Sequence, residues 1–234
     1  MNKRQNYSIL KAKYDKVNKG NARITQSSLF LTKPISQSVT SYTFDVLETQ
    51  TQSLTNDQIR LNLNDEFNIT EIGLYLVGYI GDNTRETFNP NTKLFTYAPY
   101  HLSLADATKL QNFYAGTFKI AINNIVFMEK WDTAKHECVT RTQINPYKVG
   151  VDATPVLALE NSQNLSRDGI YPLANIITLS GAKKNDLTIN LPDAIKPATF
   201  PYVDSQGVAN TITIDRVGVL LRGFNSQNSA SFQK

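Results

Sequence analysis

The sequence predicts a β-dominated protein, and three observations lead to this prediction. Asn and Thr number 23 each among the 234 residues; Asn favours turns, and Thr favours half-buried pleated surfaces. From residue 28 onward the apolar residues recur mainly at every second position, which is the period of a strand. Charged residues make up only 19% of the chain. This composition argues against a helical bundle, a coiled coil and a disordered chain.

The first 27 residues form a basic arm that differs from the rest of the chain. Residues 1–25 hold seven Lys or Arg against Asp15 alone, a net charge of +6, whereas the whole chain carries +4. The arm predicts an amphipathic helix over about residues 5–18, because apolar residues recur at steps of three and four and Gly20 would end the helix. The residues of this apolar stripe are Tyr7, Leu10, Tyr14 and Val17.

Two interpretations of the predicted helix stay open. In the first, the helix packs on its own protein and its lysines are solvated. In the second, the helix faces an anionic partner, either lipid headgroups or nucleic acid. The apolar stripe is short, so a membrane contact would be weak unless many copies act together. The candidate cations of the arm are Lys3, Arg4, Lys11, Lys13, Lys16, Lys19 and Arg23.

Three strands are predicted after the arm. Alternation of apolar and polar residues indicates strands at 42–47 and 59–64, separated by a polar turn. A third strand, at 67–80, changes phase at Thr70 and Glu71, which predicts a bulge or a sharp bend. Beyond this point both faces of the strand are apolar, so we expect it to be buried on both sides.

A loop, a short strand and a helix are expected next. Residues 81–92 are rich in Asn, Thr, Asp and Gly, as surface loops are, and a strand is expected at 94–100. Ser103 and Asp106 have the spacing of a capping box, with Asp in the Glu position, which predicts a helix over 104–114.

Two later stretches show the same interrupted alternation. Within residues 118–128 the pattern breaks at the Asn pair 123–124 and then resumes out of phase. Within residues 212–221 it slips at residues 215–216. A two-residue turn and a bulge would each produce such a break, so the sequence leaves both open for the Asn pair.

The order of patterns in the second half of the chain repeats that of the first half. Residues 59–65 resemble 187–193, and residues 116–128 resemble 210–221. Alternation alone can produce such short matches, whereas a true duplication would give two similar β-domains in tandem. We place the junction within residues 133–150, where periodicity is weak. The expected units are the arm 1–27, a first β-domain 28–140 and a second β-domain 141–234.

No catalytic constellation is evident, so we expect no enzyme and no cofactor. The nucleophile elbow, the phosphate-binding loop and the dinucleotide-binding glycine pattern are all missing from the sequence. His136 and Cys138 would share a strand face, but a metal needs three or four ligands, so a loop His and a small buried Cys are the favoured interpretation. We interpret Asp65, Glu66 and Glu71 as solvated acids at strand ends rather than as a catalytic pair.

The single cysteine and the N-terminus bear on where the chain folds. Cys138 alone cannot form an internal disulfide framework. The N-terminus has no apolar signal segment, so we expect synthesis and folding in a reducing compartment. One group of aromatic residues suggests either a sugar-binding face or, as the favoured interpretation, a subunit interface or core. Its members are Tyr97, Tyr100, Phe113 and Tyr114.

Taken together, these features resemble a known family of viral proteins. A short basic N-terminal helix, two tandem β-domains without catalytic residues and a helix inserted late in the first domain resemble a double jelly-roll major capsid protein of membrane-containing icosahedral bacteriophages. The composition, rich in Asn and Thr, is similar to that of structural proteins of small single-stranded DNA phages that infect Bacteroidetes. The resemblance implies an all-β fold of two tandem jelly rolls, with a short N-terminal helix and one inserted helix.

The resemblance also implies a function and partners. Homotrimers would form pseudo-hexagonal tiles that contact neighbouring capsid subunits in an icosahedral shell, made in the host cytoplasm and residing in the virion. The cations of the arm would face an internal membrane or the genome, and no small-molecule substrate is implied. The chain is short for two jelly rolls, so a single jelly roll or another β-sandwich with long loops remains an alternative.

Two other classes remain as alternatives. One is a phage accessory structural protein, such as a head decoration, a spike or a tail component, built on a β-sandwich without internal duplication. The other is a carbohydrate-binding β-sandwich, which would expose a planar row of aromatic side chains.

Overall fold

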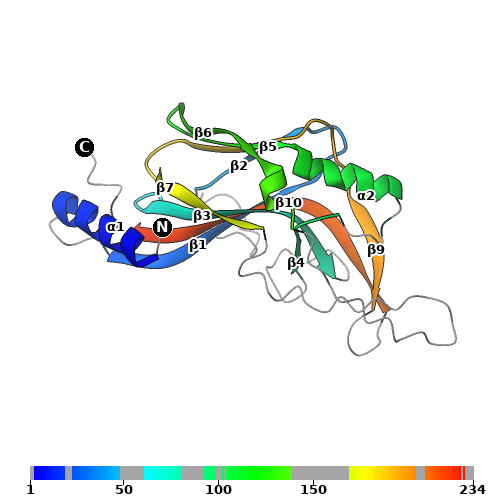
Figure 1. Ribbon diagram of the computed structural model, residues 1–234, viewed down its shortest axis with the longest axis horizontal. Helices are drawn as coiled ribbons and strands as arrows, with labels where there is room; N and C mark the ends of the chain where they lie inside the picture. The colour runs from blue at the N-terminus through cyan, green and yellow to red at the C-terminus, as the bar shows by residue number, and fades with distance from the viewer. Residues whose placement is uncertain are drawn as a thin grey trace.

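The computed structural model describes residues 3–18, 23–47, 61–80, 92–98, 102, 104–138, 169–203, 209–227 and 229. These residues are mostly in antiparallel strands, with two short α-helices, so the prediction of a β-dominated fold is confirmed (Figure 1). In chain order the elements are α1 Lys3–Asn18, β1 Arg23–Pro34, β2 Ser41–Phe44, β3 Glu66–Ile80, β4 Thr92–Phe95, α2 Leu104–Gln111, η1 Asn112–Ala115, β5 Thr117–Ile122, β6 Ile125–Asp132, η2 Thr133–His136, β7 Ile170–Ser180, β8 Asn185–Asn190, β9 Ala198–Val203 and β10 Ala209–Gln227.

Both predicted helices are present. Helix α1 covers the range expected for the arm, and α2 with the 3-10 helix η1 covers the range expected after the capping box. Residues 3–18 include neither Gly nor Pro, and their Ala, Leu, Lys and Arg are good helix formers. Of the strand expected at 94–100 the structure has β4, which ends at Phe95, and the loop expected at 81–92 lies almost wholly outside the described residues.

The strands form two sheets. In the first sheet the long strands β10 and β3 lie side by side in the centre. One edge of β10 pairs with β1 and β9 along different parts of its length, and the far edge of β3 pairs with β7 and β4 in the same way. The second sheet has the order β2-β8-β5-β6. Every strand pair in both sheets is antiparallel.

The two sheets pack face to face around one hydrophobic core (Figure 1). Leu74 and Val219 enter it from the first sheet, and Phe118 and Ile189 from the second, and all four are fully buried. Leu110 of α2 closes one side of the core. Because alternate residues of a strand face opposite sides, each sheet gives one face to this core and the other to its surroundings.

The division into tandem domains 28–140 and 141–234 does not match this pairing. Strands β1 and β3 belong to the first range and pair with β10 of the second, while β2 and β5 pair with β8. The described strands of both ranges therefore form one β-sandwich with one core rather than two. Alternation is a local property that shows only which residues share a face, so it could not reveal which strands pair.

The two sequence matches behind the expected duplication correspond to different structures. Leu61 makes only an isolated bridge to Leu47 and leads into a turn, whereas its proposed counterpart Ile189 lies within β8. The strand expected at 59–64 is therefore wrong over its described residues. Residues 116–128 include the β5–β6 hairpin, but residues 210–221 belong to the single strand β10.

The interruptions in alternation are of two kinds. Asn123 and Asn124 form a two-residue hairpin turn with φ of 48° and 65°, conformations that Asn tolerates better than most residues. In β10 the register shifts between Ile214 and Arg216, and the strand continues past the shift. In β3 the register shifts between Ile69 and Glu71, which confirms the bulge or bend predicted there.

Strand β3 is buried on both faces, as predicted. Ile72, Leu74 and Leu76 face the main core and have no exposed area. Tyr75 and Val77 point to the other side of the sheet, where they form a second buried cluster with neighbouring aromatic and apolar side chains. Because side chains on both of its faces are buried, β3 has a continuous apolar sequence rather than an alternating one.

Candidate functional site

Helix α1 is bound to the outer face of the first sheet. Leu10 and Tyr14 lie one helical turn apart, each 2% exposed, and they pack with Phe224 of β10 and Ile176 of β7. The ring of Tyr7 also lies 6.0 Å from that of Phe224, although Tyr7 is 42% exposed. We call Leu10 and Tyr14 the docking face of α1. These two residues of the stripe face the protein itself, as in the first of the two interpretations of the arm, and the side chain of Val17 is not described.

A buried polar network lies under the docking face. The Tyr14 hydroxyl donates to Oε2 of Glu66 at 2.7 Å, and Nδ2 of Asn68 donates to the Tyr14 oxygen at 3.0 Å. Thr178 of β7 donates its hydroxyl to Oδ1 of Asn68 at 2.8 Å, and Nδ2 of Asn68 also lies within hydrogen-bonding distance of Ser226 in β10. The network thus joins α1 to three neighbouring strands of the first sheet.

Glu66 is 1% exposed, so its interpretation as a solvated strand-end acid is wrong. Its charge is offset by Lys13, whose Nζ lies 3.8 Å from Oε2 of Glu66 and 3.5 Å from the Thr178 hydroxyl. Burial raises the pKa of Tyr14 above its ordinary value, and the neighbouring Glu66 carboxylate also raises it. The hydroxyl therefore stays protonated at neutral pH and acts as the hydrogen-bond donor to the Glu66 carboxylate.

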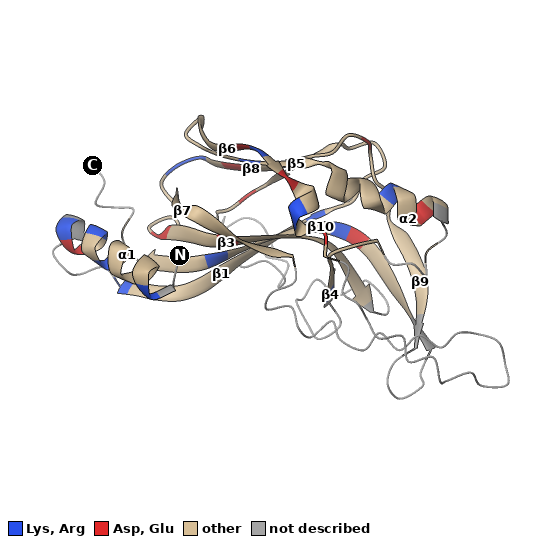
Figure 2. Ribbon diagram, viewed as in Figure 1, with Lys and Arg blue, Asp and Glu red and all other residues tan. Residues whose placement is uncertain are grey.

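The candidate cations of the arm separate into two groups. Lys13 takes part in the docking of the helix, and its Nζ also lies 4.9 Å from the centre of the Tyr14 ring. Four others have exposed side chains, and Figure 2 shows basic residues along α1. These four are Arg4, Lys11, Lys16 and Arg23. Lys3 lies in α1 but its side chain is not described, and Lys19 lies outside the described residues.

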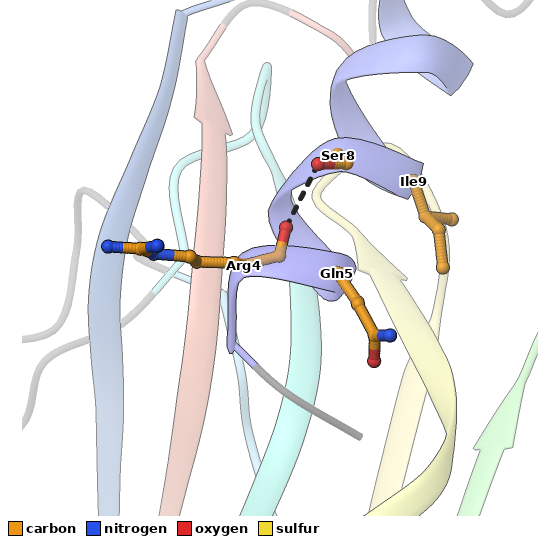
Figure 3. Close-up of a pocket in the computed structure, with 4 residues that line it drawn as sticks. All are labelled: Arg4, Gln5, Ser8 and Ile9. Carbon is orange, nitrogen blue, oxygen red and sulfur yellow. Dashed lines mark hydrogen bonds between the residues drawn. The ribbon is translucent and has the colours of Figure 1, made fainter.

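A shallow hollow runs along the exposed side of α1 (Figure 3). It is lined by Arg4, Gln5, Ser8 and Ile9, and the Ser8 hydroxyl donates to the Arg4 carbonyl at 3.0 Å. Arg4, Gln5 and Ser8 are exposed, and Ile9 is 47% exposed. Lys11 and Lys16 are also exposed on this helix, outside the hollow.

His136 is a buried structural residue. Its Nε2 accepts a hydrogen bond from the Trp131 indole N–H at 2.8 Å, and its Nδ1 donates to the Gly169 carbonyl at 2.6 Å. Both ring nitrogens are therefore occupied in the neutral form, so the ring is not free to act as a base for Cys138. Burial is the main cause that lowers the pKa of His136. Among the described residues, no group of three or more His, Cys, Asp and Glu could hold a metal ion.

The four aromatic residues that suggested either a sugar-binding face or an interface or core have different environments. Phe113 and Tyr114 are buried, which agrees with the favoured core interpretation, while Tyr100 lies outside the described residues. Trp131 and Tyr171 meet edge to face, with centroids 5.6 Å apart and an interplanar angle of 77°. Lys135 places its Nζ 4.1 Å from the Trp131 ring centre. Lys135 and Trp131 therefore make a cation–π contact within this cluster.

The β5–β6 hairpin carries an exposed apolar surface that sequence reasoning missed. Ile125, Val126 and Phe127 are 64%, 45% and 55% exposed. We call these three residues the hairpin tip. A sequence signal was present, because three consecutive apolar residues directly after a two-residue turn cannot all point to one core face.

Comparison of the sequence with protein-family models finds no match, and comparison with curated proteins finds none either. Among the described helices, none is long and apolar enough to cross a membrane. The described residues do present two distinct surfaces on one sandwich. One is the basic outer side of α1 on the first sheet, and the other is the hairpin tip on the second.

Proposed function

We propose that the protein is a structural subunit of a viral shell, built on a single jelly roll. The observation that carries the proposal is the strand order. A jelly roll has eight strands in two four-stranded sheets that form two Greek keys. If β4 and β9 are treated as additions to the sheet edges, the remaining orders are β1-β10-β3-β7 and β2-β8-β5-β6. The chain then changes sheet after every strand except at the β5–β6 hairpin, as a jelly roll does.

The surfaces of the sandwich favour an assembly role within this fold. Jelly rolls serve as viral capsid domains and as lectin domains, so the fold alone does not select the function. A basic helix fixed on one sheet provides a surface for an anionic shell interior, either genome or membrane. The edge-to-face aromatic cluster, with a lysine over the Trp131 ring, does not favour sugar binding.

The number of sandwiches per chain changes the expected geometry of the shell. Three chains with one sandwich each present three sandwiches around an axis, whereas a pseudo-hexagonal tile made by a trimer needs six. We therefore propose symmetric copies of a one-sandwich subunit in place of the trimeric tile. The same observation favours a second candidate, a phage accessory structural protein, because that class also lacks an internal duplication.

Electron microscopy and analytical ultracentrifugation of the purified protein test the proposal. We expect closed shells, sheets or discrete symmetric rings as protein concentration rises, with and without nucleic acid or anionic vesicles. A shell protein gives closed or curved lattices, and an accessory protein gives discrete rings or spikes. A 26.2 kDa monomer under every one of these conditions would contradict both candidates.

A further inference from the structure

The position of the hairpin tip is fixed by the rest of the sandwich. The backbone N–H of Asn123 donates to the Lys184 carbonyl at 2.9 Å, and the Lys184 N–H donates to Oδ1 of Asn123 at 3.0 Å. The turn between β5 and β6 is therefore clamped to the connection that precedes β8. In Figure 1 the hairpin projects from the second sheet. The tip is therefore held to the rest of the sandwich by two hydrogen bonds.

Burial within the described fold does not account for this surface. Single exposed apolar residues are ordinary, but contiguous exposed apolar patches mark sites of interaction. The three tip residues lie at the end of the hairpin, and each keeps close to half or more of its surface exposed. Ile125 pairs with Ile122 and Val126 with Ala121, so the apolar side chains lie on both faces of the hairpin end. The neighbouring residues Glu129 and Lys130 are exposed and carry opposite charges, so two copies of this surface would not repel each other.

Strand β6 lies at the edge of the second sheet, but its backbone is poorly suited to pair with another strand. Its register with β5 shifts twice, between Phe118 and Ile120 and again between Ile120 and Ala121. Bulges of this kind twist a sheet edge and discourage the addition of a further strand. A partner would therefore contact the side chains of the tip and not extend the sheet.

The size of the tip argues for a repeated contact. Its exposed apolar area is on the order of 300 Å², whereas a stable pair of proteins buries roughly 800 Å² on each partner. A contact this small does not hold a single partner on its own, but symmetry can repeat it many times in one assembly. An apolar surface that meets its own copy across an axis is also complementary to itself.

We propose that the hairpin tip of Ile125, Val126 and Phe127 is a contact between copies of this chain, with tip against tip around a symmetry axis of the assembly. The inference rests on the proposed function, and it names the surface through which neighbouring subunits meet. The tip supplies the apolar contact, and the clamp at Asn123 holds it at a fixed angle.

Chemical cross-linking within assembled protein tests this proximity. In a Cys138→Ser background, Ile125→Cys places one thiol on the tip, and Leu63→Cys places one on a turn where the native side chain is 60% exposed. A short bismaleimide should convert assembled Ile125→Cys protein largely into covalent dimers and leave Leu63→Cys protein largely monomeric. Equal yields from the two variants would overturn the proposal.

A second experiment measures the energetic role of the tip. Phe127→Ser should raise the protein concentration needed for assembly about tenfold. Burial of one Phe side chain strengthens the affinity of a contact by at least about that factor. Leu63→Ser is the matched control and should leave that concentration unchanged. Both variants should keep the wild-type urea midpoint, because both side chains are exposed.

The outcomes separate the inference from the proposed function. If the wild type assembles and Phe127→Ser assembles at the same concentration, the tip contact is wrong while the shell proposal stands. If no form assembles, both fail. If Phe127→Ser assembles normally but no longer sediments with vesicles that the wild type binds, the tip contacts lipid and the proposal is overturned.

Discussion

Helix α1 and the β5–β6 hairpin both place large apolar side chains outside the main core, yet their environments differ. Leu10 and Tyr14 of α1 are each 2% exposed, because β7 and β10 of the same chain supply a complementary surface. Ile125 and Phe127 of the hairpin are 64% and 55% exposed in the described structure. Apolar residues outside the main core can be read from the sequence in both regions. The sequence does not show whether another part of the same chain covers them.

The two regions also differ in their polar contacts. Under α1 the buried Glu66 carboxylate is paired with Tyr14 and Lys13, which fixes how the helix sits on the sheet. At the hairpin the polar contacts lie in the turn at Asn123, and the tip itself carries only apolar side chains. We expect substitutions under α1 to change the stability of the fold, and substitutions at the tip to change assembly.

The largest expected effect is that of Leu10→Ala. It removes a buried side chain between α1 and the first sheet and should lower the free energy of unfolding by about 2 kcal/mol or more. Ile9→Ala is the control, because Ile9 is the next residue on the same helix and is 47% exposed; its effect should stay within about 0.5 kcal/mol. Urea unfolding measures both. Equal losses would show that α1 does not dock through Leu10.

Tyr14→Phe should have the next largest effect. The change keeps the ring but removes the donor to Glu66, so a buried carboxylate loses a hydrogen bond and the free energy of unfolding should fall by about 1–3 kcal/mol. Tyr7→Phe is the matched control on an exposed side of the same helix. A Tyr14→Phe variant as stable as Tyr7→Phe would argue against the network.

His136 should make stability depend on pH. Its pKa is lowered in the folded protein, so between the ordinary His pKa near 6.5 and that lowered value the unfolded chain binds more protons than the folded one. Stability should therefore fall as pH decreases through this window, by up to about 1.4 kcal/mol per pH unit. The charged and titratable groups facing the ring are Lys135 and Asp132 on its own segment and Tyr171 of β7.

Urea midpoints measured between neutral and mildly acidic pH check this expectation. His136→Gln removes the titrating group and should flatten the pH dependence over that range, even if its stability at neutral pH is lower. Trp131 of β6 donates a hydrogen bond to His136, so the stability of the variant at neutral pH also reports the loss of this bond. An unchanged slope in the variant would assign the pH dependence to other groups.

The exposed cations of α1 should give the smallest effect for each residue. Lys11→Ala with Lys16→Ala should weaken binding to anionic vesicles or to an oligonucleotide about thirtyfold at low salt, since each cation near such a surface contributes about 1 kcal/mol. Lys109→Ala with Lys130→Ala removes two exposed lysines from other elements and should change little. Replacing Leu10 and Tyr14 with Ser would not distinguish binding to lipid from binding to nucleic acid. Both side chains are buried against the sheet, so their loss would remove the contact of α1 with the rest of the protein.

Several features of the fold could be predicted from local sequence. The apolar spacing predicted a helix over about 5–18, where α1 lies, and the two apolar faces of β3 predicted its burial on both sides. The phase change at Thr70 predicted the irregularity that the register shift confirms. Each of these is a property of neighbouring residues along the chain, which is why the pattern was sufficient.

Tertiary structure decided the features that depend on residues far apart in the sequence. The buried Glu66 accepts a hydrogen bond from Tyr14 of α1, more than 50 positions earlier. Leu61 and Ile189 have similar surroundings in sequence but different partners in space. The sequence by itself determined the two helices and the two apolar faces of β3. The pairing of β1 with β10 and of β2 with β8, and so the choice of one sandwich over two, came from long-range packing, because alternation carries no information about the partner strand.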